Sequence, residues 1–130
     1  NAEFGSLLIV EDEPLLAMQM SRSMEEHGWS IYGIAGSLDE ANRLLSERRP
    51  PDAAILDVDL MGKDVSPLAH SLRTAGVPFI FCSGFEDLRH MADFARHRAV
   101  RKPATVRQII DGLKDVLHST RAELMPRPVG

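Results

Sequence analysis

The sequence predicts an α/β fold: one domain built as a doubly wound three-layer sandwich, with helices on both faces of a parallel sheet. Two observations support this prediction. Short, continuous apolar runs alternate five times with longer stretches of helical period, an order typical of a parallel sheet covered by helices. The 130 residues also suit a single domain, because a chain of this size buries about two thirds of its unfolded surface. The right-handed crossover rule then favours the doubly wound topology.

Five strands are expected where apolar residues follow one another without a polar break. The three strongest candidates are residues 7–10, 53–56 and 79–82, and the two weaker ones are residues 31–35 and 99–100. Five helices are expected between and after them, with apolar residues three or four positions apart. They begin near Pro14, at a capping box formed by Ser37 and Glu40, near Val65, near Leu88 and near Val106.

Domain boundaries follow from composition at the two ends of the chain. Residues 1–6 are typical of an expression scar and are excluded from the fold. Residues 7–118 are expected to form the domain, and the Pro-containing residues 119–130 a C-terminal tail. The single cysteine, Cys82, excludes an intramolecular disulfide and is expected to be a buried apolar residue. The sequence has neither a membrane-spanning run nor a signal peptide, so a cytoplasmic location without membrane association is expected.

Polar residues stand directly after four of the apolar runs. They are Glu11 and Asp12 after the first, Asp57 and Asp59 after the third, Ser83 after the fourth and Lys102 after the fifth. In a parallel sheet these strand ends lie at one edge, where open α/β sheets bind ligands. Distant parts of the chain are therefore expected to form one site.

The chemistry of this set points to a divalent cation and a phosphoryl group. Neighbouring carboxylates repel one another unless a cation lies among them, and Mg²⁺ prefers carboxylate and water oxygens. A lysine and a serine hydroxyl can bind phosphoryl oxygens. Asp57 is the natural phosphoryl acceptor, because Glu11 and Asp12 are adjacent and better placed to share the metal.

Two other functions remain open from the residues alone. A small Mg²⁺-dependent phosphatase could use Asp57 as nucleophile and Asp59 as general acid, although the chain has no insertion to enclose a substrate. A binding scaffold that is never phosphorylated is the other alternative, although all its acidic and lysine positions are present.

Four segments in this order and spacing, residues 9–12, 55–58, 79–84 and 101–103, resemble a bacterial two-component receiver domain. The resemblance implies a flavodoxin-like sheet of order 2-1-3-4-5 and a signalling switch rather than a turnover enzyme. It implies that a sensor histidine kinase or histidine phosphotransfer protein phosphorylates Asp57. It also implies Mg²⁺ at Glu11, Asp12, Asp57 and the backbone carbonyl of Asp59, with Ser83 and Lys102 on the phosphoryl group. The Lys102–Pro103 peptide would be cis, and the phosphorylated form would slowly dephosphorylate itself.

The chain departs from the commonest receiver pattern at Ala99, where most members carry an aromatic residue that rotates on phosphorylation. Residues 81–85, Phe-Cys-Ser-Gly-Phe, resemble a subclass named for a Phe-Ala-Thr-Gly stretch in the fourth strand. Members of that subclass lack the aromatic switch and are often single-domain proteins. The resemblance implies that the signal passes through residues 83–85 and the following helix.

Charge is divided unevenly along the chain. The formal net charge is −4, which argues against direct nucleic-acid binding. Between Arg89 and Arg107 there are six Lys or Arg and one acidic residue, so this stretch is basic and the remainder acidic. A solvated surface would explain the stretch, and the alternative is recognition of an acidic protein partner or self-association.

Overall fold

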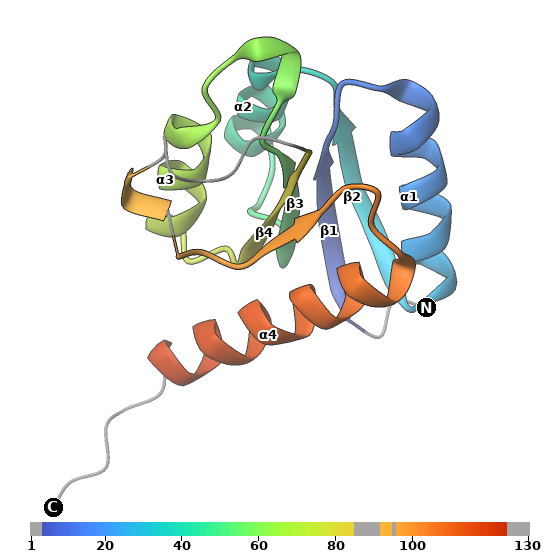
Figure 1. Cartoon of the computed structure of the whole chain (residues 1–130). Helices are drawn as coiled ribbons and strands as arrows, with labels where there is room; N and C mark the ends of the chain where they lie inside the picture. Colours follow the sequence, from blue (N-terminus) through green and yellow to red (C-terminus); the bar gives the residue numbers. More distant parts are fainter. Residues whose placement is uncertain (1–3, 85–91, 95, 125–130) are drawn as a thin grey trace, which may run out of the picture.

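A computed structural model describes residues 4–84, 92–94 and 96–124 (Figure 1). Its strands are β1 (Gly5–Val10), β2 (Trp29–Ala35), β3 (Ala53–Asp57), β4 (Phe79–Ser83) and β5 (Ala99–Arg101). Its helices are α1 (Pro14–Glu26), α2 (Leu38–Glu47), α3 (Ser66–Thr74) and α4 (Val106–Leu124), with 3₁₀ turns η1 (Leu60–Gly62) and η3 (Ala92–Phe94). None of the helices in the described ranges is long and apolar enough to cross a bilayer.

The five strands form one parallel sheet of order β2-β1-β3-β4-β5, so the predicted fold class and strand order are confirmed. Helices α1 and α4 cover one face and α2 and α3 the other (Figure 1). The strands β3 and β4 are buried along their whole length, which is why their sequences are apolar without alternation.

Helix starts follow the local sequence signals. Pro14 occupies the first turn of α1, where a missing N–H costs no hydrogen bond. The Ser37 side chain accepts a hydrogen bond from the Glu40 N–H at 3.2 Å, and the Glu40 carboxylate accepts one from the Gly36 N–H at 3.2 Å. The Glu40 carboxylate therefore reaches the residue before the cap, a variant of the expected capping box.

The ordered fold extends beyond both predicted boundaries. At the start, β1 begins at Gly5, and the Phe4 ring packs on Trp29 with centroids 5.6 Å apart. Residues 4–6 therefore pair with the sheet instead of lying outside it. At the end, α4 continues to Leu124, past the last residue of its apolar stripe, Leu117. Each added helical residue gains a backbone hydrogen bond, so the length of a helix need not end with its apolar stripe.

The predicted fourth helix falls largely outside the described residues. Two of its apolar positions, Leu88 and Met91, are not among them, and neither is Phe85 of the expected signalling loop. The described part of the segment is the single turn η3. Phe94 at its end is buried against Phe79 and Phe81, with ring centroids 6.0 and 5.7 Å away. This aromatic cluster packs beneath Ala99, the neighbour of Phe81 in the sheet.

Candidate phosphoryl-acceptor site

The predicted site residues lie together because parallel pairing brings the strand ends to one edge. Val10 pairs with Leu56 in the sheet, so Glu11 and Asp57, the next residue on each strand, are neighbours. Ser83 ends β4 and Lys102 follows β5, and the Lys102 N–H donates to the Ser83 carbonyl at 2.7 Å. This backbone bond holds the last two strand ends together at the same edge.

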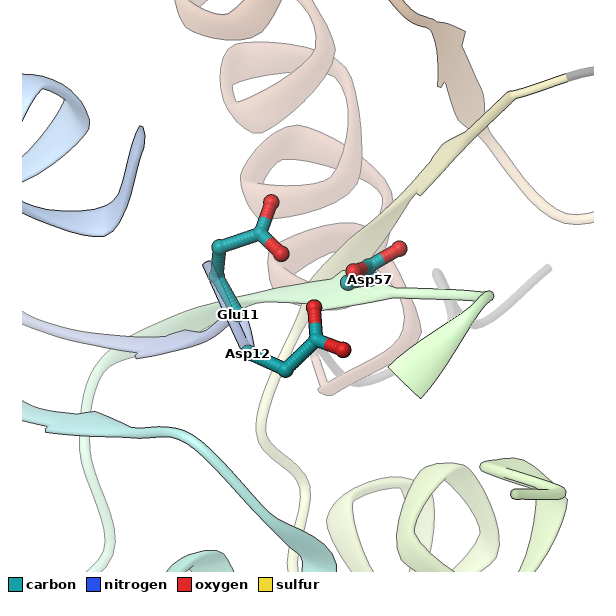
Figure 2. Close-up of side chains that lie close together, drawn as sticks. All are labelled: Glu11, Asp12 and Asp57. Atoms are coloured by element: carbon teal, nitrogen blue, oxygen red, sulfur yellow. The ribbon is translucent and has the colours of Figure 1, made fainter. Parts of the chain in front are cut away.

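Three carboxylates converge at this edge (Figure 2). Glu11, Asp12 and Asp57 each offer an oxygen atom, and these atoms lie within 4.8 Å of one another. Glu11 and Asp57 are each only 3% exposed. Burial, followed by the hydrogen bond to Asp57, raises the pKa of Glu11 to about 7, despite the opposing effect of Lys102. The negative charge here is thus crowded and poorly solvated.

The ammonium group of Lys102, the residue that follows β5, partly neutralises the negative charge of these carboxylates. Its Nζ atom lies 3.0 Å from Glu11 Oε1 and 3.2 Å from Asp57 Oδ1. Burial by itself would lower the pKa of Lys102, but the hydrogen bond to Glu11 and the charge of Asp57 outweigh it and raise the pKa. The ammonium group therefore stays charged beside Asp57. The Lys102–Pro103 peptide is cis, as the resemblance implied.

Two backbone N–H groups also orient the carboxylates, and the sequence reading missed them. Asp59 N–H donates to Asp57 Oδ1 at 3.0 Å, and Glu13 N–H donates to Glu11 Oε2 at 3.4 Å. In each case the donor stands two residues after the acceptor, and for Asp57 this is the spacing that Asp side chains commonly use in turns. That spacing was readable in the sequence. The Asp59 side chain itself is exposed.

The donor set fits a hard divalent cation. Carboxylate oxygens are protein ligands that Mg²⁺ usually takes. A dication would offset the negative charge of these carboxylates, among which burial is the chief cause of the raised pKa of Glu11. Cys82 lies behind the site, 2% exposed, and burial raises the pKa of its thiol to about 12. The thiol is therefore protonated and packs as an apolar group, as predicted.

A cavity of about 580 Å³ opens beside the site between α1 and α4. It is bordered by Lys102, Gly84 and Cys82 from the sheet and by Met20 and Ile109 from the two helices. The sequence did not indicate a cavity at this place, because the separation of two helices is a tertiary property.

A parallel five-stranded sheet with an acidic cluster and a lysine at its carboxyl edge defines an α/β domain with a candidate site for a divalent cation and an anionic group. Residues 7–114 match the family model of the response regulator receiver domain, and the chain belongs to that family. The predicted family is thereby confirmed.

The chain is similar to part of two curated proteins that are named as regulators. The chain is 31% identical over 83 residues to the phyllosphere-induced regulator PhyR of Methylorubrum extorquens, a match covering 62% of this chain and 31% of PhyR. It is 28% identical over 113 residues to the transcriptional regulatory protein PdtaR of Mycobacterium tuberculosis, covering 83% of this chain and 54% of PdtaR. The matched part thus spans 31% of one relative and 54% of the other.

Solved structures share the fold. The signal receiver domain of a modulated diguanylate cyclase from Desulfovibrio desulfuricans superposes with a TM-score of 0.79 at 25% identity, covering 93% of this chain and 99% of that one. A response regulator receiver protein from Sinorhizobium medicae also superposes with a TM-score of 0.79, at 20% identity, covering 91% and 98%. The second likeness concerns the fold alone.

Proposed function

We propose that this receiver domain is a cytoplasmic, phosphorylation-controlled signalling switch whose acceptor is Asp57. The observation that supports it best is the placement of the Asp57 carboxylate: buried, oriented by the Asp59 N–H, and 3.2 Å from the Lys102 ammonium. The phosphoryl donor is a histidine kinase or a histidine phosphotransfer protein, the donors with which receiver domains work. The basic residues of β5 and its flanks would meet a second, acidic partner.

In the proposed reaction, an oxygen of Asp57 attacks the phosphorus of a phosphohistidine. An O–P bond forms, the P–N bond breaks, and its electron pair stays on the imidazole of the donor. Lys102 lies beside Asp57 and would neutralise charge on the transferred group, with the Ser83 hydroxyl donating to another of its oxygens. Water later attacks the acyl phosphate, which restores the carboxylate and releases inorganic phosphate.

Glu11, Asp12, Asp57 and the Asp59 carbonyl would hold Mg²⁺, which when bound supplies charge neutralisation for the incoming phosphoryl oxygens. The phosphorylated state would shift an equilibrium between two conformations of the domain. The residue at the usual switch position is Ala99, whose small side chain packs against the core beneath β5. The conformational change would therefore depend on other residues.

Labelling with acetyl phosphate tests the acceptor directly. Asp57→Asn should abolish incorporation of labelled phosphate in the presence of Mg²⁺, while Asp111→Asn, an equal change of charge on exposed α4, should label like the parent. Phosphorylation should also require Mg²⁺ and be lost in EDTA. Undiminished labelling of Asp57→Asn would sink the assignment, and steady multiple turnover of a phosphate ester would favour a phosphatase.

A further inference from the structure

A second cavity, of about 420 Å³, lies at the opposite edge of the sheet from Asp57. It is formed by the end of α3, the start of β4, residues 96–98 and the second half of α4. The five residues of β4 separate the two sites, which is about 13 Å at the usual strand rise. The cavity is therefore distinct from the acceptor site.

The rim of this cavity is cationic. Three arginines from different parts of the chain border it, Arg73, Arg96 and Arg98, against one acidic residue, Asp115. The sequence showed Arg96 and Arg98 as part of a basic stretch, and the fold adds Arg73 from α3. The same fold places Arg101 and Lys102 at the other cavity, so the basic stretch is divided between two surfaces.

Two of the arginines are held in place before any ligand binds. Arg98 donates from Nε to Asp115 Oδ2 at 3.0 Å and from Nη1 to the Ala99 carbonyl at 3.1 Å, yet its side chain remains 39% exposed. The guanidinium carbon of Arg73 lies 4.2 Å from the centroid of the Phe94 ring. Fixed guanidinium groups lose less entropy when they bind a carboxylate, which they can do with two parallel hydrogen bonds.

The floor of the cavity is apolar and aromatic. Val77, Phe79 and Val116 line it and are nearly fully buried. The His97 ring stacks on Phe79 at 4.2 Å and bonds the Phe79 carbonyl through Nε2 at 2.7 Å, and its burial lowers its pKa. A neutral imidazole thus extends the floor. A ligand that fits carries negative groups at its edges and an apolar group between them.

We infer that this cavity binds an acidic peptide segment of a partner protein, with carboxylates on Arg73, Arg96 and Arg98 and an apolar side chain on the Phe79–Val116 floor. Its volume is in the range of about 300–1,000 Å³ usual for ligand sites. The chain carries a net charge of −4, so a long polyanion would be repelled elsewhere on its surface. A short acidic segment meets the local charge of three arginines and one aspartate, which is positive in sum.

The inference takes up the acidic partner of the proposed function but does not depend on phosphorylation. A fluorescein-labelled peptide, Glu-Glu-Leu-Glu-Glu, is titrated with the whole protein at low salt, and binding is followed by fluorescence anisotropy. Arg73→Gln/Arg96→Gln should weaken binding at least tenfold. Arg107→Gln, which removes one charge from α4 outside the cavity, should change it less than twofold, and Asp57→Asn should leave it unchanged.

Three results of the anisotropy titration would contradict binding of an acidic peptide in this cavity. Equal binding of the glutamine version of the peptide, no binding of the acidic one, or equal weakening by Arg107→Gln would overturn it. Complete displacement by millimolar inorganic phosphate would show that the cavity takes a free anion instead. If the double variant unfolds, Arg96→Gln alone, which changes an exposed residue, should still weaken peptide binding measurably. In the unchanged protein, the amide chemical-shift changes caused by the peptide should centre on residues 73–79 and 96–98.

Discussion

Asp57→Asn should stabilise the metal-free protein, although it removes the proposed phosphoryl acceptor. The Asp57 carboxylate lies 3.2 Å from Lys102 Nζ, an attraction of about 5 kcal/mol at an effective dielectric constant near 20. Oxygens of Glu11 and Asp12 lie within 4.8 Å of it, and each repels it by at least about 3.5 kcal/mol on the same basis. The two repulsions therefore exceed the attraction of Lys102 by at least about 2 kcal/mol. Asparagine removes this charge and keeps an oxygen for the Asp59 N–H.

The assay is thermal or urea unfolding in EDTA at pH 8.5, where Glu11, with a pKa of about 7, is ionised. For 130 residues, 2 kcal/mol corresponds to an increase of about 7 °C in the unfolding midpoint. Saturating Mg²⁺ should reverse the order, because a ligand at 100 times its Kd stabilises the parent by about 2.7 kcal/mol. Asp111→Asn, at an exposed position, should stay within about 0.5 kcal/mol of the parent.

Two results would refute this reasoning. If Asp57→Asn is less stable than the parent in EDTA, the attraction of Lys102 outweighs the carboxylate repulsion. If Mg²⁺ stabilises the parent and the variant equally, Asp57 takes no part in binding the metal.

The remaining predictions concern the aromatic cluster. Phe94→Ala should lower the free energy of unfolding in urea by about 3–5 kcal/mol, because it leaves a cavity beside Phe79 and Phe81. Phe94→Leu should lower it clearly less, because leucine fills most of that space. Equal losses in the two variants would contradict the packing argument. The pKa of His97 is lowered in the fold, chiefly by burial, so the unfolded chain binds its proton more tightly. Stability should therefore fall as the pH drops below about 6.5, the pKa of a free histidine. Between pH 7.5 and 5.5, His97→Gln should lose less stability than the parent; parallel pH curves would show that His97 stays solvated.

The fold was predictable because its strands and helices carry their signals locally. The strands β3 and β4 are apolar without alternation, which indicates burial on both faces, and Pro14 and Ser37 mark helix starts. The first and last residues of the fold were harder to predict from the sequence. Phe4 belongs to the fold through its contact with Trp29, a residue far away in sequence, and the length of α4 beyond Leu117 depends on no apolar pattern.

The order of residues along the chain was enough to predict which polar groups gather at the carboxyl edge of the sheet, since each one follows a strand and parallel strands end together. Their contacts depend on tertiary packing, which places Lys102 beside both Glu11 and Asp57 and raises the pKa of Glu11. The burial of a side chain and its distance from another depend on how helices and strands pack, and the spacing of residues along the sequence does not give them. The same holds for the second cavity, where Arg73 joins Arg96 and Arg98 only because α3 packs beside β4 and η3.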